Sequence, residues 1–89
     1  MTTTLMKRYL VLTMRKPTFD AAAIEPHYAY LDALRARGQL ELAGPFSDKS
    51  GGAYLLLADN FEDALAIAHT DPVHLTGSSE VVVREWNAK

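Results

Sequence analysis

The stretch Ile24-Glu-Pro-His-Tyr-Ala-Tyr-Leu-Asp-Ala-Leu-Arg-Ala-Arg-Gly-Gln-Leu-Glu-Leu-Ala43 decides the fold. In its first part, the residues of one predicted buried face recur every three or four positions, which is the spacing of one side of a helix. These residues are Ile24, His27, Leu31 and Leu34. Gly38 ends that helix, and residues 39–43 then alternate polar and apolar, as a strand does. The change of period predicts an α+β domain.

Outward from this stretch, three segments rich in β-branched, aromatic and aliphatic residues predict further strands at 8–14, 53–58 and 80–86. Asp59 and Glu62 resemble a capping box and predict the start of a second helix. That helix is expected to end before Asp71-Pro72, because a residue before proline disfavours helical angles. Residues 1–6 are expected to be a frayed start. The order βαββαβ predicts a ferredoxin-like fold, in which two helices cover one face of a four-stranded antiparallel sheet, as one domain over residues 1–89.

The predicted strands are apolar on both faces. Leu10, Leu12 and Met14 alternate with Tyr9 and Val11, and the strand at 80–86 carries valine on both sides. An antiparallel sheet with one open face should be polar there. We therefore expect a homodimer that pairs through the open sheet face, with a higher oligomer as an extension of it.

Composition excludes several classes of function. The chain has 89 residues, a net charge of −2 and no cysteine, so disulfides and thiolate metal sites are excluded. No basic cluster is present, so no nucleic-acid partner is expected. The apolar runs are too short to span a membrane, and residues 1–12 lack the features of a signal peptide, which leaves the cytoplasm as the expected location.

His27 is the first candidate for chemistry, because it takes the place of an apolar residue on the helical face that should meet the sheet. An imidazole in that position is either a core histidine bonded to a backbone carbonyl or a general acid/base. A catalytic histidine needs a carboxylate to orient it, and Asp71 is the predicted partner. Asp71 also suits a plain structural role as the cap of a short turn over residues 72–76.

Other polar groups offer alternatives. Asp71 and His74 are three residues apart, so a metal site completed by His27 or His69 is an alternative, although no clear third ligand is placed and we expect no metal or other cofactor. Ser47 is a candidate substrate contact or an ordinary turn serine. Phe46 and Tyr30 are candidates for lining a pocket for an aromatic ligand, as are Tyr28 and Trp86.

The chain resembles the YciI-like (YCII-related) family, within the dimeric α/β-barrel superfamily, over nearly its whole length. The resemblance lies in His27-Tyr-Ala-Tyr-Leu31, Gly38-Gln-Leu-Glu-Leu-Ala-Gly-Pro45, Gly51-Gly52, Asp71-Pro72 and the last strand with Trp86. It implies a ferredoxin-like dimer with an active site that contains His27 and Asp71. The family often has an arginine where this chain has Ile24, and an aromatic residue where it has Val73.

The resemblance implies a cofactor-independent lyase or isomerase that uses a His–Asp pair for acid/base chemistry, for example the dehydrochlorination of a hydroxylated aromatic. Two alternatives stay open from the sequence. One is a non-catalytic dimer that binds a small ligand or accompanies another enzyme, and the other is a small cofactor-free monooxygenase.

Overall fold

The computed structural model describes residues 6–89, so the expected frayed start at residues 1–6 lies outside the described residues apart from Met6. Within these described residues, eight elements follow one another: β1 (Lys7–Arg15), the 3₁₀ helix η1 (Ala21–Ala23), α1 (Ile24–Ala36), β2 (Leu40–Pro45), β3 (Gly51–Ala58), α2 (Phe61–Ala68), α3 (Pro72–Leu75) and β4 (Ser79–Glu85). None of the helices in residues 6–89 is long and apolar enough to cross a membrane.

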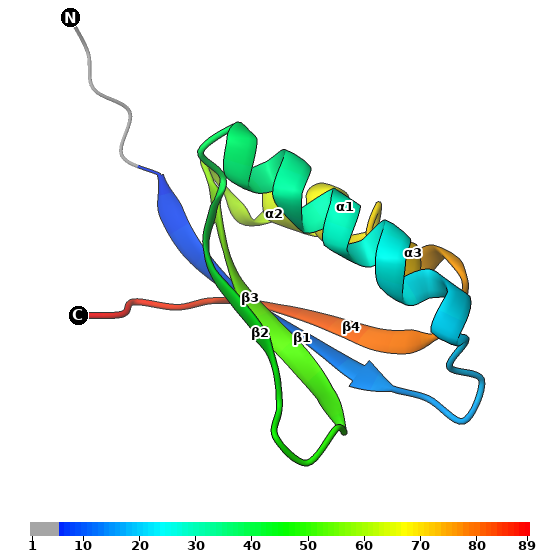
Figure 1. The fold of residues 1–89 in the computed structure, drawn as a ribbon. Helices are drawn as coiled ribbons and strands as arrows, with labels where there is room; N and C mark the ends of the chain where they lie inside the picture. Colours follow the sequence, from blue (N-terminus) through cyan, green and yellow to red (C-terminus); the bar gives the residue numbers. More distant parts are fainter. Residues whose placement is uncertain (1–5) are drawn as a thin grey trace, which may run out of the picture.

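The strands form one sheet in the order β2-β3-β1-β4, and every neighbouring pair is antiparallel. The helices α1, α2 and α3 all lie on one side of this sheet (Figure 1). The predicted ferredoxin-like arrangement is confirmed, with η1 and α3 as short additions to it.

The core lies between the helices and one face of the sheet. Every second residue of β1 and β3 points into it, and the register pairs Tyr9 with Leu56 and Val11 with Tyr54. Leu31 and Leu34 of α1 complete the core from the helical side. The helical face predicted from the spacing of apolar residues is therefore the face that α1 buries.

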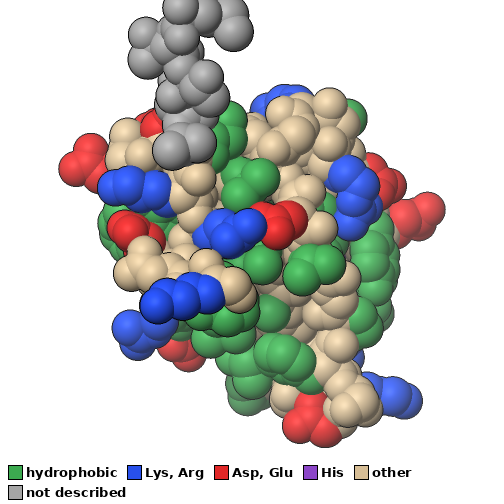
Figure 2. Space-filling model, turned by 90° about the vertical axis from the view of Figure 1, so that its left-hand side faces the viewer, with side chains coloured by type: hydrophobic (Ala, Val, Ile, Leu, Met, Phe, Trp, Pro, Cys, Tyr) green, Lys and Arg blue, Asp and Glu red, His purple; other side chains and the backbone are tan. Residues whose placement is uncertain are grey.

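The opposite face of the sheet is also apolar, as the alternation predicted. Leu10 pairs with Leu55, and Leu55 pairs in turn with Leu42, so the three leucines share this face. Leu42 is 64% exposed, and Met14 is exposed as well. Part of this side is visible in Figure 2, where hydrophobic side chains lie between charged ones.

Two local predictions need correction. The side-chain cap of α2 is Asn60, whose Oδ1 accepts from the Asp63 N–H at 2.8 Å, and not Asp59. The strand predicted at residues 39–43 runs from Leu40 through Pro45, because β2 is an edge strand on which a proline without an N–H is tolerated. The hairpin turn is accordingly residues 46–50.

Candidate active site

His27 lies one turn into α1, on the side that faces the sheet and α3. Pro26 precedes it in the first turn, where the missing N–H costs no helical hydrogen bond. His27 Nδ1 lies 2.7 Å from Asp71 Oδ1, and its side chain is 17% exposed. The sequence prediction that these two side chains meet is confirmed as geometry, and their catalytic role stays a prediction.

Asp71 is fully buried and makes both of the contacts that its sequence context suggested, one with the start of α3 and one with His27. It is the N-cap of α3, where its Oδ1 accepts from the Val73 N–H at 3.0 Å. The same oxygen faces His27, and Oδ2 accepts from the hydroxyl of Tyr54 at 3.1 Å. Three donors therefore converge on one buried carboxylate, which satisfies it in its ionised form.

Tyr54 and Tyr30 extend this network behind the histidine. Because Tyr54 gives its one proton to Asp71, the Tyr30 hydroxyl is the donor to the Tyr54 oxygen at 3.0 Å, and the Ile67 carbonyl at 3.1 Å is a second acceptor for the same proton. Burial raises the pKa of Tyr30 to about 12 and raises the pKa of Tyr54 well above the ordinary value. Both hydroxyls are therefore protonated at neutral pH, and the Tyr54 proton is available to Asp71.

This network fixes which nitrogen of His27 is free. A carboxylate only accepts hydrogen bonds, so Nδ1 carries the proton in the contact with Asp71. The remaining nitrogen, Nε2, is then the unprotonated one in the neutral ring. An imidazole in this state accepts a proton at Nε2, and the buried carboxylate stabilises the imidazolium that forms.

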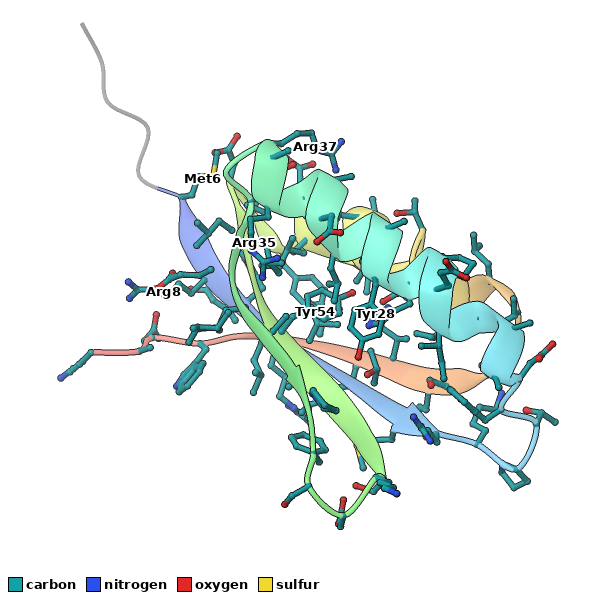
Figure 3. The ribbon with its side chains drawn as sticks, in the orientation of Figure 1. Met6, Arg8, Tyr28, Arg35, Arg37 and Tyr54 are labelled. Atoms are coloured by element: carbon teal, nitrogen blue, oxygen red, sulfur yellow. The ribbon has the colours of Figure 1, made fainter. Side chains whose placement is uncertain are left out.

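A cavity of about 220 Å³ lies between α1 and the sheet, and His27 is part of its wall. Apolar groups from Phe19, Ile24, Leu31 and Val73 line it together with Tyr28 and Tyr54. Tyr54 comes from the sheet and Tyr28 from α1, and both side chains lie between the two layers (Figure 3). A cavity of about 150 Å³ accommodates benzene in another protein, so this one is large enough for a single substituted ring.

The close approach of β2 to β3 at the cavity wall depends on glycine. A Cβ on Gly52 would lie 2.7 Å from the carbonyl oxygen of Gly44 across the strand pair. Gly44 itself has open space around the same position. Gly52 thus lets the two strands meet beside the cavity, which a side chain at residue 52 would prevent.

The structure does not bring the other predicted contacts to this cavity. Ser47 and Phe46 lie in the hairpin turn between β2 and β3, and neither lines the cavity. Tyr30 lies in the network behind His27, and Trp86 is exposed. A ligand role for Ser47 and Phe46 stays a prediction that the cavity does not support.

Sequence reasoning missed Tyr54 and Arg15, which both line the cavity. A signal for Tyr54 was present, because it alternates in phase with Leu56 and so had to face the helices. Arg15 likewise follows Val11 and Thr13 in phase on β1.

The metal alternative gains no support. No group of three or more His, Cys, Asp or Glu side chains that could hold a metal ion occurs within residues 6–89. His69 lies at the exposed end of α2, and its ring stacks on that of His74 with the centroids 4.4 Å apart. The Asp71 side chain is turned away to His27 and Tyr54.

The comparisons with known proteins agree with this fold. Residues 7–87 match the model of the YCII-related domain, and the chain belongs to that family, as the resemblance predicted. The Bacillus subtilis (strain 168) protein YjpA, which is uncharacterized, is 46% identical over 84 residues, covering 94% of this chain and 99% of YjpA.

A solved structure of low sequence identity has the same fold. It is 5-chloro-2-hydroxyhydroquinone dehydrochlorinase (TftG) from Burkholderia phenoliruptrix AC1100, in complex with 2,5-dihydroxybenzoquinone. The two chains superpose with a TM-score of 0.73 at 18% identity, and the match covers 92% of this chain and 95% of TftG. This likeness is one of fold.

Proposed function

We propose that the protein is a cofactor-independent acid/base enzyme, a lyase or isomerase, that acts on a small hydroxylated or enolisable ring. The observation that carries the proposal is the 2.7 Å contact of His27 Nδ1 with the buried Asp71, in the wall of a cavity of about 220 Å³. The contact leaves Nε2 as the general base. A dehydrochlorinase with this fold supports the choice of a single-ring substrate.

In an elimination, the ring would react as its keto tautomer, in which the carbon that carries the leaving group is saturated, and Nε2 would take the proton of a conjugated ring hydroxyl. The electron pair of that O–H bond forms a new carbonyl, the ring double bond shifts to the carbon that carries the leaving group, and the leaving group departs as an anion with its own bonding pair. The substrate loses one proton and one anion, so no oxidant or reductant is needed. Asp71 stabilises the imidazolium until it returns the proton to water. A positioned general base contributes about 10²- to 10⁴-fold to the rate.

The test compares His27→Ala with His69→Ala, which removes a histidine from the exposed end of α2. Chloride release from chlorinated hydroxyhydroquinones and proton exchange at enolisable carbons in D₂O are the two readouts. We expect the rate of the His27 variant to fall at least 100-fold and the His69 variant to keep the wild-type rate. A folded His27→Ala protein with full turnover would refute the proposal, as would a wild-type protein that catalyses neither reaction.

We also propose that two copies pair through the open sheet face. The support is the apolar character of that face, which includes the 64% exposed Leu42. Light scattering after gel filtration should give a dimer for the wild type and a shift toward monomer for Leu42→Glu. Leu75→Glu is the matched control, because Leu75 is 69% exposed but belongs to α3 on the other layer. A wild-type monomer at about 100 μM would contradict this proposal.

A further inference from the structure

We propose that the cavity binds its substrate as an anion and that Arg15 is the residue that recognises the negative charge. The inference rests on the proposed function for the assignment of this cavity as the active site. It adds the chemical class of the substrate, which is a planar ring that carries a carboxylate, an enolate or a phenolate.

Arg15 reaches the cavity because of its phase on β1. It is the last residue of the strand and follows Val11 and Thr13 at intervals of two, so it shares their face of the sheet. Its backbone N–H donates to the Ser50 carbonyl at 2.9 Å, which holds this end of β1 against the start of β3. The residue lines the same cavity as His27.

The guanidinium of Arg15 is held by an aromatic ring. Its central carbon lies 4.2 Å from the centroid of the Phe19 ring, and Phe19 is also part of the cavity wall. An arginine stacked on a ring uses its flat face and keeps its N–H edges for an acceptor. Those edges match the geometry of a carboxylate or of two neighbouring ring oxygens.

The charges around the cavity leave Arg15 without a counter-ion. The ion pairs within residues 6–89 are Arg8–Glu41, His27–Asp71 and Arg35–Asp32. Arg35 and Asp32 both line the cavity and offset each other at 3.5 Å. Asp71 is buried behind His27 and already accepts three hydrogen bonds. The cavity therefore carries one uncompensated positive charge.

This charge suits the proposed chemistry. Removal of a proton by His27 leaves an electron pair on the substrate ring, and a ring that is already an anion resists that step in an apolar site. A guanidinium in the same cavity offsets the developing charge. The other guanidinium of the cavity, that of Arg35, is paired with Asp32, so Arg15 is the cation that remains for this purpose.

The experiment measures binding by isothermal titration calorimetry with two pairs of probes. The first pair is 2,5-dihydroxybenzoquinone, an acidic enol that is an anion at neutral pH, and its neutral dimethyl ether. The second pair is benzoate and benzamide, which have nearly the same size but differ in charge. We expect the wild type to bind each anion at least tenfold more tightly than its neutral partner.

Arg15→Gln should weaken binding of the anions by about 10- to 100-fold and leave the neutral probes within twofold. Arg15→Lys should recover part of the loss, because it restores the charge but not the planar fork. Lys16→Gln is the matched control, since Lys16 is the next residue and a cation of the same surface that does not line the cavity. It should change anion binding by less than twofold. Circular dichroism checks that each variant is folded.

Three outcomes would overturn the inference: no anion preference in the wild type, no binding of either anion, or equal effects of the Arg15 and Lys16 variants. Failure of the proposed function is a separate result. It would appear as full turnover in His27→Ala, whereas anion binding in that variant should stay within a few-fold of the wild type. Anion selectivity that depends on Arg15, together with turnover that does not depend on His27, would keep this inference and reject the acid/base role.

Discussion

Replacement of Asp71 by alanine tests the buried network most directly. The change removes the N-cap of α3, which contributes about 1 kcal/mol, and two hydrogen bonds to a charged acceptor, worth about 1.5–3 kcal/mol each. Removal of a buried charge also relieves a desolvation cost of several kcal/mol. We therefore expect a net loss of about 3 kcal/mol in the free energy of unfolding. A domain of this size has only about 4–13 kcal/mol in total.

Urea unfolding monitored by circular dichroism measures this loss. With a slope near 1 kcal/mol per M, typical of a small domain, the midpoint should fall by about 3 M. Asp20→Ala is the matched control, because Asp20 caps η1 through one 2.9 Å bond from the Ala22 N–H but is exposed. It should cost about 0.5–1 kcal/mol. Equal losses in the two variants would show that the contacts of Asp71 with His27 and Tyr54 contribute nothing to stability.

Three further predictions concern the surroundings of the site. The pKa of Tyr30 is raised from about 10 in the unfolded chain to about 12, so its contribution to stability is complete below pH 10 and is lost as the pH rises from 10 to 12. Urea midpoints between pH 8 and pH 11.5 should therefore fall more steeply for the wild type than for Tyr30→Phe, and parallel curves would contradict this. Gly52→Ala should lower the free energy of unfolding by about 1–3 kcal/mol, because its Cβ meets the Gly44 carbonyl at 2.7 Å, whereas Gly44→Ala should change it little. Asn60→Ala should cost about 1 kcal/mol and Asp59→Ala close to nothing, and the opposite order in thermal unfolding would restore Asp59 as the cap of α2.

Alternation and spacing along the chain were sufficient to predict the fold. The strand period of two placed Tyr9 and Val11 on one face and Leu10 on the other, and the helical period identified the face of α1 that is buried. The start of α2 could not be assigned in the same way, because Asp59 and Asn60 are adjacent and both can cap a helix. The choice depends on backbone angles that spacing does not determine.

The His27–Asp71 contact was predictable because each residue departs from its local pattern. A histidine interrupts an apolar helical face, and Asp-Pro breaks a helix next to it in space. Tyr54 and Arg15 were harder to assign, because alternation gives the face of a residue but not its neighbour across the sheet. That neighbour depends on register, which pairs Tyr54 with Val11 and brings the end of β1 beside Gly51. Ser47 and Phe46 were placed near the site from their position after β2, but the turn carries them beyond the cavity.

Asp71 begins α3 and holds His27 with the same oxygen atom, and this double role has a consequence for ligand binding. The orientation of the imidazole is preorganised, because the side chains around it become ordered when the chain folds and not when a ligand arrives. Binding then loses little conformational entropy at this point of the cavity. The stability of the fold and the orientation of His27 therefore depend on the same side chain, since a substitution at Asp71 that abolishes the orientation of His27 also weakens the fold. Selection for stability alone would therefore preserve the geometry of the site.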